Sequence, residues 1–382
     1  MDNAVQDNVM VLINAIDSKL KKVHTQSLDL SFNELLDMFK NKELDIAPDY
    51  QRLFQWSEGA RSRFIESLLL EMPVPPIYVI EEESSRYLLI DGLQRISSYL
   101  HLRGELDAPH LDPPVTVGQK LTFIDCDIVT ELNGRTYDEI GTALQIRLKR
   151  AFIRVEVVRK GSDSRFKYWM FKRLNTGGQQ LNEQQIRNCS IRLLNSMFID
   201  FIKELTENDD FKSCIELVNA GRKIAAFDEE LILRFYSFKN NLAGFSHDVS
   251  DFLTEYMEAV SDPAVGAVAF NYIEEKASFD KTFGILNRTL GDRSFAYANR
   301  ERNDISRGFS VYHFEAFTVG LQPHLHAIDL ANPAQLEKVG DVLRAVKLNP
   351  EFIRITTGGG KNSPGPLKAR INFVQDRIGA AL

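Results

Sequence analysis

The stretch that decides the fold of the first half of the chain reads Tyr87-Leu-Leu-Ile-Asp-Gly-Leu-Gln-Arg-Ile-Ser-Ser-Tyr-Leu100. Its apolar beginning predicts a buried strand over 87–90, followed by a tight turn at Asp91-Gly92 and a helix that begins at Leu93. Gly92 permits a close backbone turn that a Cβ would obstruct. Gln94 and Arg95 then fall in the first helical turn, where unpaired N–H groups and the positive end of the helix dipole face outward.

An arginine in the first turn is unfavourable for the helix itself, but it suits an anion bound at that terminus. Such an anion can use the backbone amides and the guanidinium fork of Arg95 together. Asp91, at the end of the strand, can hold a divalent cation or orient a polar group of a ligand. The alternative is an ordinary strand-turn-helix with Arg95 in solvent, because Asp-Gly turns are common.

The composition is that of an ordinary globular protein. The chain has 382 residues, a net charge of −7, 44% hydrophobic and 26% charged residues, and this length suffices for two domains. No apolar run approaches the roughly 18 residues that span a bilayer, and the N-terminus lacks the features of a signal peptide. We therefore expect a cytoplasmic protein without a membrane segment, in which the separated Cys126, Cys189 and Cys214 are buried free thiols. No HExxH or Cys/His zinc spacing occurs.

A loop before the decisive stretch carries aromatic, amide and arginine side chains. In residues 48–56, Tyr50 and Trp56 offer flat faces on which a base can stack, and Gln51 and Arg52 can hydrogen-bond polar edges or phosphate. The alternative is that the aromatic side chains form a small core under the loop. The lack of a period of 2 or 3.6 predicts an ordered loop.

A second polar loop reads Asn175-Thr176-Gly177-Gly178. Two glycines allow positive φ angles and a close approach of the backbone to a ligand. The following helix, which Asn182 and Gln185 cap, carries Asn188 as a further candidate. The alternative is a helix end followed by a linker, which needs only one glycine.

Periodicity predicts a change of architecture after Cys189. Before it, strands and helices alternate; after it, only helical periods occur, so we expect an α+β domain followed by an all-α domain. The expected strands are 44–46, 77–80, 87–90, 121–128 and 151–158. The expected helices of this half are 5–22, 32–39, which a Ser31/Glu34 capping box opens, 57–71, 136–149 and 165–174. Helix 5–22 has an apolar stripe that could pack on the body or on a second copy.

A local basic excess stands against the acidic whole. Residues 147–173 contain ten Lys/Arg and two acids, which could contact phosphates. The alternative is a solvated face balanced by acidic neighbours.

Several motifs together resemble a known family, the N-terminal domain of GmrSD-type modification-dependent restriction endonucleases. They occur in one order: Tyr50-Gln51-Arg52, Trp56, Ile65-Glu66-Ser67-Leu68, Pro73-Val74-Pro75-Pro76-Ile77-Tyr78, Asp91-Gly92-Leu93-Gln94-Arg95, and Phe171-Lys172-Arg173-Leu174-Asn175-Thr176-Gly177-Gly178. The resemblance implies a ParB/sulfiredoxin-like core with a small mixed sheet over residues 28–195. An N-terminal helix (1–27) would precede it, and an all-helical domain (196–382) would follow.

The resemblance also implies an activity. The family's Asp-Gly-Gln-Gln-Arg motif maps to residues 91–95, with Leu93 where an amide is usual, and in several members it binds and hydrolyses a nucleoside triphosphate in defence against phage. On this basis Asp91 would hold Mg²⁺, and Gly92, Gln94 and Arg95 would cradle the phosphates. The loop 50–56 would line the base side, and Asn175 to Gly178 would form the opposite wall.

The resemblance leaves other roles open. Sulfiredoxins have a cysteine in the corresponding turn, and this chain has none, which excludes that chemistry. Residues 196–382 lack a His-Asn-His nuclease spacing, so we expect any cleavage of DNA to come from a separate nuclease or effector subunit. The alternatives are a DNA-binding protein or nuclease subunit of ParB-like fold, and a non-catalytic scaffold that recruits an effector. Oligomers are possible in each case.

Overall fold

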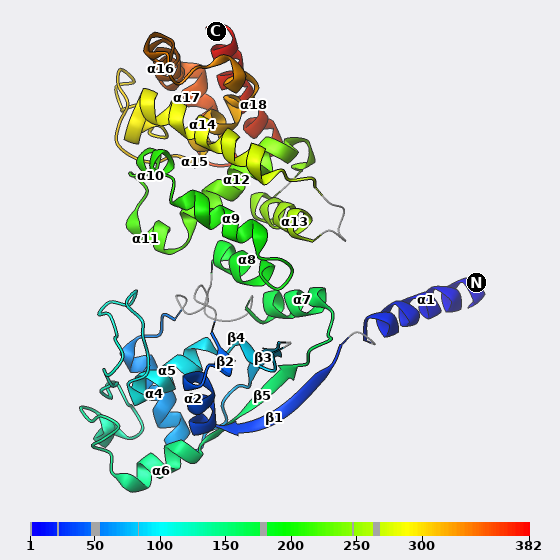
Figure 1. Cartoon of the computed structure of the whole chain (residues 1–382), viewed down its shortest axis with the longest axis vertical. Coiled ribbons are helices and arrows are strands. Elements are labelled where there is room, and N and C mark those ends of the chain that lie inside the picture. The colour runs from blue at the N-terminus through cyan, green and yellow to red at the C-terminus, as the bar shows by residue number, and fades with distance from the viewer. Residues whose placement is uncertain are drawn as a thin grey trace. The chain divides into compact units, whose positions relative to one another are not determined.

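The chain forms two compact units, Met1–Leu181 (unit 1) and Asn182–Leu382 (unit 2), and each is described here by itself (Figure 1). The computed structural model describes residues 2–20, 23–46, 54–82, 84–175, 182–246, 248–262 and 268–382. Unit 1 is α+β, and the described residues of unit 2 contain helices but no strand. The expected architecture, a small mixed sheet with helices followed by an all-α half, is confirmed.

Unit 1 is built on a five-stranded mixed sheet with the order β1-β5-β3-β4-β2. The pairs β1·β5 and β3·β4 are antiparallel, whereas β5·β3 and β4·β2 are parallel. The strands are β1 (Thr25–Ser31), β2 (Leu44–Asp45), β3 (Ile77–Glu81), β4 (Tyr87–Asp91) and β5 (Phe152–Val158). Since β3 and β4 are antiparallel neighbours, the start of β3 and the end of β4 lie at the same edge of the sheet.

The helices of unit 1 begin at residues that cap them. Ser31 accepts a hydrogen bond from the N–H of Glu34, and Ser57 accepts one from the N–H of Ala60, so both expected starts are confirmed. The expected helix 136–149 begins later, at Thr142, directly after Gly141 with φ +82°. The helices are α1 (Asp2–Leu20), α2 (Phe32–Lys40), α4 (Glu58–Leu69), α5 (Leu93–Arg103), α6 (Thr142–Arg150) and α7 (Ser164–Asn175).

One expected strand is absent, and one strand of the sheet was not predicted. Residues 121–128 form no strand, although Leu121 and Phe123 are buried. The N–H groups of these two residues donate to the carbonyls of His101 and Arg135, and side chains satisfy residues further along the loop. The N–H of Ile124 donates to Ser62 Oγ, and that of Ile128 donates to Glu66 Oε1. Conversely, β1 was not expected, because it is a largely exposed edge strand whose only apolar signal is the alternation of Leu28 and Leu30.

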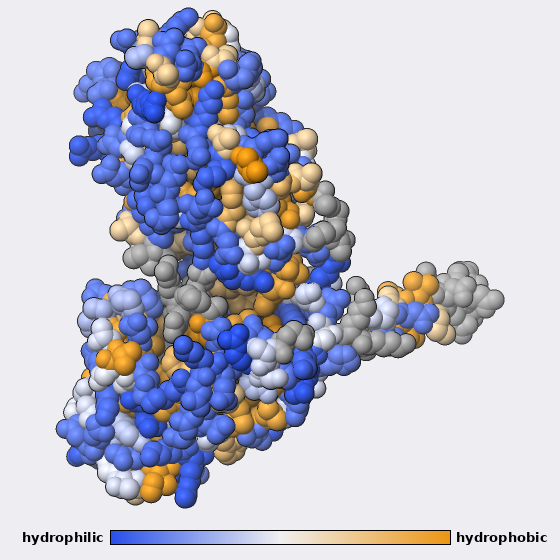
Figure 2. Space-filling model, viewed as in Figure 1, coloured by the Kyte–Doolittle hydropathy of each residue, from blue (hydrophilic) through white to orange (hydrophobic). Residues whose placement is uncertain are grey.

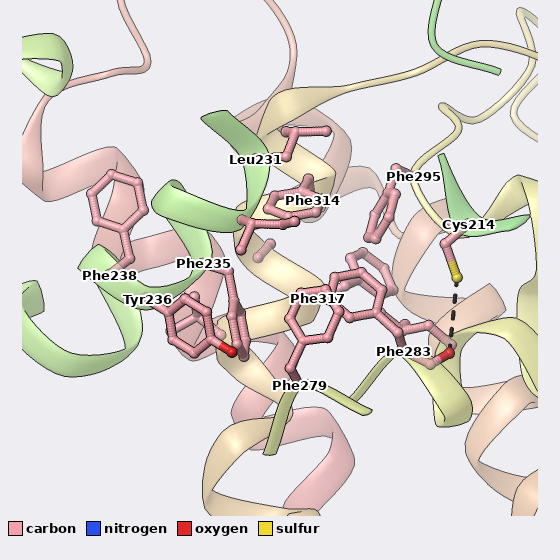
Figure 3. Close-up of a cluster of buried hydrophobic side chains, with 14 of the residues drawn as sticks. Cys214, Leu231, Phe235, Tyr236, Phe238, Phe279, Phe283, Phe295, Phe314 and Phe317 are labelled. Atoms are coloured by element: carbon pink, nitrogen blue, oxygen red, sulfur yellow. Dashed lines mark hydrogen bonds between the residues drawn. The ribbon is translucent and has the colours of Figure 1, made fainter. Parts of the chain in front are cut away.

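Unit 2 is a helical bundle around one large aromatic core, which Figure 3 shows in part. Phe235 of α12, Phe279 and Phe283 of α14, and Phe314 of α15 meet there, with the rings of Phe279 and Phe283 4.4 Å apart. The helices are α8 (Glu183–Ile191), α9 (Met197–Thr206), α10 (Asp209–Cys214), α11 (Ala220–Ile224), α12 (Phe227–Asn241), α13 (Val249–Ser261), α14 (Tyr272–Leu290), α15 (Val311–Gly320), α16 (Pro333–Leu348), α17 (Pro350–Thr356) and α18 (Pro364–Gly379).

The cysteines carry free thiols, two of them buried. Cys214 donates to the carbonyl of Phe283 at 3.9 Å (Figure 3), and burial raises its pKa to about 12. Burial likewise raises the pKa of Cys126 to about 11. Cys189 is only half-buried, so the expectation of three buried thiols was wrong for this one. Across the described ranges, no helix is both long and apolar enough to cross a membrane.

Candidate functional site

The candidate site lies where β4 ends and α5 begins. Gly92 connects them with φ +104°, a left-handed backbone conformation that residues with a Cβ rarely adopt. A Cβ at this position would lie 2.3 Å from Ile77 Cγ2 on β3. The turn therefore needs glycine for both its backbone angle and its contact with the neighbouring strand, and the expected strand-turn-helix is confirmed.

Asp91 and Arg95 form an ion pair across this turn. Arg95 Nη2 donates to Asp91 Oδ2 at 2.8 Å and to the carbonyl oxygen of Pro76 at 3.0 Å. The two side chains are 15% (Arg95) and 29% (Asp91) exposed, so the pair lies at the edge of the fold. Within the described parts of the chain, Arg95 Nη1 and Nε make no hydrogen bond, and Nε is buried. The guanidinium is thus only partly used by the protein.

The start of α5 has the electrostatics of an anion site. Gly92 provides no side-chain cap, and the first turn contains no acidic residue. The Gly92 carbonyl accepts a hydrogen bond from the N–H of Ile96 at 3.0 Å. The N–H groups of the residues before Ile96 therefore have no partner within the helix. These donors, the helix dipole and Arg95 all favour negative charge at this point.

Gln94 links the turn to the segment that precedes α4. Its Oε1 accepts from the backbone N–H of Gln55 at 3.2 Å and from that of Trp56 at 3.1 Å. Trp56 is half-buried, and its ring lies edge-on to Phe64 at 5.8 Å. One face of Trp56 therefore packs in a small aromatic cluster, as the alternative for this loop proposed. The structure thus places the Gln94 side chain against the backbone of Trp56, and the part of both residues in a ligand site stays a prediction.

Two buried residues behind Trp56 were not expected from the sequence. Arg61 Nε donates to the carbonyl of Trp56 at 2.8 Å, and Arg61 Nη1 donates to His101 Nδ1 at 3.0 Å. The guanidinium also lies 4.8 Å from the ring centre of Phe54. Burial, together with the charge of Arg61, lowers the pKa of His101 to about 4, so His101 is neutral and accepts. No sequence motif signals this pair, because the two residues are 40 positions apart.

Asn175 joins the site from the end of α7. Its Nδ2 donates to the carbonyl of Ile90 at 3.2 Å and to that of Phe171 at 2.9 Å. It therefore ties α7 to the last residues of β4, next to Asp91. The neighbouring candidates of this loop, Thr176, Gly177 and Gly178, lie outside the described residues, as do Tyr50, Gln51 and Arg52.

Asn188 belongs to unit 2 and is buried in a network of its own. Its Nδ2 donates to Glu229 Oε2 at 2.6 Å, and its Oδ1 accepts from Gln184 Nε2 at 2.8 Å. These bonds use its amide to join α8 to α12. The structure gives it a place in the interior of unit 2, and its part in a ligand site stays a prediction.

Asp91 is the one acidic side chain at the turn. The described part of the chain contains no group of three or more His, Cys, Asp or Glu side chains that could hold a metal by themselves. Mg²⁺ is often held by only one or two carboxylates together with substrate phosphates. A single carboxylate beside an anion site fits that mode.

The basic stretch 147–173 is partly neutralised. Arg147 pairs with Glu71, Arg154 with Asp29, and Arg159 with Glu81. Acidic neighbours thus balance part of the excess positive charge, which agrees with the alternative of a solvated surface.

The comparisons with known proteins concern the same part of the chain. Residues 32–192 match the family model of the GmrSD restriction endonuclease, N-terminal domain. This is the family that the motifs resembled. The GmrSD match begins at α2, includes the β4–α5 turn, and covers every candidate residue from Tyr50 to Asn188. No curated protein and no solved structure matches the chain.

Proposed function

We propose that the β4–α5 turn binds the phosphates of a nucleoside triphosphate together with Mg²⁺, and that the protein hydrolyses this nucleotide. We place this activity in a restriction-type, anti-phage system, because residues 32–192 match a restriction endonuclease domain. The observation that carries the proposal is the meeting of Asp91, Gly92 and Arg95 at an uncapped helix start.

The donors of the turn suit a phosphate group. Phosphates bind where backbone N–H groups at a helix start and a guanidinium point to one place. The first turn of α5 offers such N–H groups. Arg95 Nη1 makes no hydrogen bond to the described residues, whereas Nε, also without a partner, is buried. Gly92 allows the close approach of a ligand that a side chain would block.

The ion pair between Asp91 and Arg95 suits an exchange of partners. Separating a half-buried pair is costly if either charge is left alone. A phosphate with a bound Mg²⁺ brings both signs at once, so that Arg95 can turn to the phosphate and Asp91 to the cation. When bound, Mg²⁺ neutralises charge on the phosphate oxygens.

Hydrolysis then requires little covalent help from the protein. Phosphoryl transfer depends mainly on positioning and on stabilisation of charge. Arg95 would stabilise the phosphate charge. Gln94 would keep Trp56 in place, because its Oε1 accepts from the backbone N–H groups of Gln55 and Trp56. We assign no general base.

A thermal-shift screen tests this proposal. The four ribonucleoside triphosphates are added with Mg²⁺ to the wild-type protein and to the Arg95→Ala and Arg86→Ala variants. Arg86 is an exposed arginine on the same hairpin, paired with Glu82, and serves as the matched control. At a ligand concentration of about 100 times Kd, we expect about 2.7 kcal/mol of stabilisation of the wild type and of Arg86→Ala.

The outcomes separate clearly. Arg95→Ala should keep its far-UV circular dichroism and lose the nucleotide shift and the release of phosphate, whereas Arg95→Lys should retain part of the binding as a point charge. If no nucleotide stabilises the wild type, or if Arg95→Ala responds like the wild type, the proposal is wrong.

DNA is the second candidate ligand, because the matched family is described as a restriction endonuclease domain. Binding to DNA phosphates would weaken steeply as salt increases. A gel-shift titration between about 50 and 200 mM salt tests this. Binding that does not depend on salt, or no binding, would count against it.

A further inference from the structure

A groove of about 1060 Å³ lies in unit 1, between the end of α4, α6 and the start of β5. Its apolar lining includes Met72, Ile146 and Phe152, all exposed, and Phe152 is 67% exposed. Pro76, whose carbonyl accepts from Arg95, is one of the lining residues. The groove thus exposes several large apolar side chains side by side, which a partner with apolar side chains of its own could cover.

Arginines surround this apolar lining. Arg154 pairs with Asp29, and Arg147 pairs with Glu71. Arg150, also in the lining, has no carboxylate partner within the described ranges. The groove therefore favours an apolar partner that carries an acidic side chain at its border.

Helix α1 has the complementary surface. Val9, Leu12, Ile13 and Ile16 have the spacing of one helical face and are between 45% and 62% exposed. Figure 2 shows hydrophobic surface on this helix. Asp17 follows the last of these side chains and borders the face. An amphipathic helix that docks in a groove uses this i, i+3, i+4, i+7 pattern.

We propose that α1 of one copy of the chain docks in the groove of a second copy, and that the exchange is reciprocal. Within one copy, both apolar surfaces are exposed, and Asp17 at the border of one complements Arg150 at the border of the other. Asp17 of one copy would lie near Arg150 of the other. A reciprocal exchange closes as a two-fold dimer, so it does not continue into a filament. This inference is independent of nucleotide binding.

Sedimentation-velocity measurements on the full-length chain test the proposal. One chain has a mass of 43.5 kDa, and we expect a species of twice this mass at micromolar concentration. Leu12→Asp on α1 and Phe152→Asp in the groove should each yield monomers, with at least a tenfold weaker dimer. Ile273→Asp, an exposed apolar position of unit 2 (83%), is the matched control and should remain dimeric.

Mixing the two variants distinguishes this arrangement from pairing between two α1 helices. Leu12→Asp keeps an intact groove, and Phe152→Asp keeps an intact α1, so an equimolar mixture retains one functional junction. We expect the mixture to form a heterodimer although neither variant dimerises alone. A monomeric wild type, a Phe152→Asp variant that dimerises normally, or a mixture that stays monomeric would each overturn the proposal.

A charge reversal tests the contact at the border. Arg150→Glu and Asp17→Arg should each weaken the dimer, and the double variant should recover most of the affinity. Far-UV circular dichroism of each variant checks that the fold is intact. Single variants that dimerise like the wild type would show that the helix does not lie in this groove.

Discussion

At the scale of single residues, Gly92 combines two constraints that can be measured separately. Alanine at this position must adopt φ +104° and also place its Cβ 2.3 Å from Ile77 Cγ2. Gly118 has φ +94° but no atom within 4 Å of an added Cβ, so Gly118→Ala measures the backbone cost alone. We expect urea unfolding to show about 1–2 kcal/mol of destabilisation for Gly118→Ala and about 2–4 kcal/mol for Gly92→Ala. Equal losses would show that the Ile77 contact yields without cost.

His101 predicts a dependence of stability on pH. Its pKa is lowered to about 4 in the folded protein from its usual 6.5, because burial and the charge of Arg61 disfavour its protonated form. The unfolded chain therefore binds the additional proton between these values, so this contribution to stability is complete above pH 6.5 and is lost as the pH falls toward 4. We expect about 1–2 kcal/mol less stability at pH 5 than at pH 7 from this residue.

Comparison with His101→Gln isolates this effect from the other titrating groups, which include the buried His313 of unit 2. The unfolding free energy of the variant should depend less steeply on pH between 5 and 7. An identical slope would contradict the assignment.

The residues of the Asp91–Arg95 turn could be predicted from the sequence because they are neighbours along the chain. Arg61 and His101 could not, because only the packing of α4 against α5 brings them together.

At the scale of elements, Glu66 of α4 holds the loop that replaces the expected strand 121–128. Its Oε1 accepts from the N–H of Ile128 at 3.1 Å and from that of Val129 at 2.6 Å. Glu66→Ala would leave two amides unpaired, and we expect a loss of about 2–4 kcal/mol in unfolding free energy. Glu66→Gln keeps one acceptor oxygen and should cost less. Hydrogen–deuterium exchange over residues 124–129 should increase in Glu66→Ala, and unchanged exchange would contradict this role.

The same loop shows why the elements were predicted unevenly. Helix starts were predicted correctly where the capping side chain and the N–H group that it accepts from are three residues apart in the sequence, as at Ser31 and Ser57. The alternation at Leu121 and Phe123 indicated burial correctly, but burial does not reveal whether the backbone pairs with a neighbouring strand or with isolated groups of a helix end or a loop. Thr25–Ser31 has the opposite character, a paired backbone with polar side chains, which leaves little hydrophobic pattern to detect.

At the scale of the whole molecule, the place where unit 2 begins can be tested with two fragments. The hydrophobic core of unit 2 includes Ile191 of α8 and ends within α18, so all its members come from this unit. Helix α8 contributes more than this side chain. Arg187, buried, donates to Thr254 Oγ1 at 3.0 Å and to Ser250 Oγ at 2.6 Å, and Asn188 donates to Glu229.

A fragment of residues 182–382 should therefore fold on its own and unfold in one cooperative transition. A fragment of residues 196–382 begins at the boundary that the family resemblance implied, and it lacks α8. It would leave Glu229 without its amide partner and uncover the core beside Ile191, so we expect it to be less stable by about 2–4 kcal/mol. Chemical denaturation followed by circular dichroism at 222 nm measures both. If the shorter fragment is equally stable, α8 adds little to the stability of unit 2, and the bonds from Arg187 and Asn188 contribute little to the core that they border.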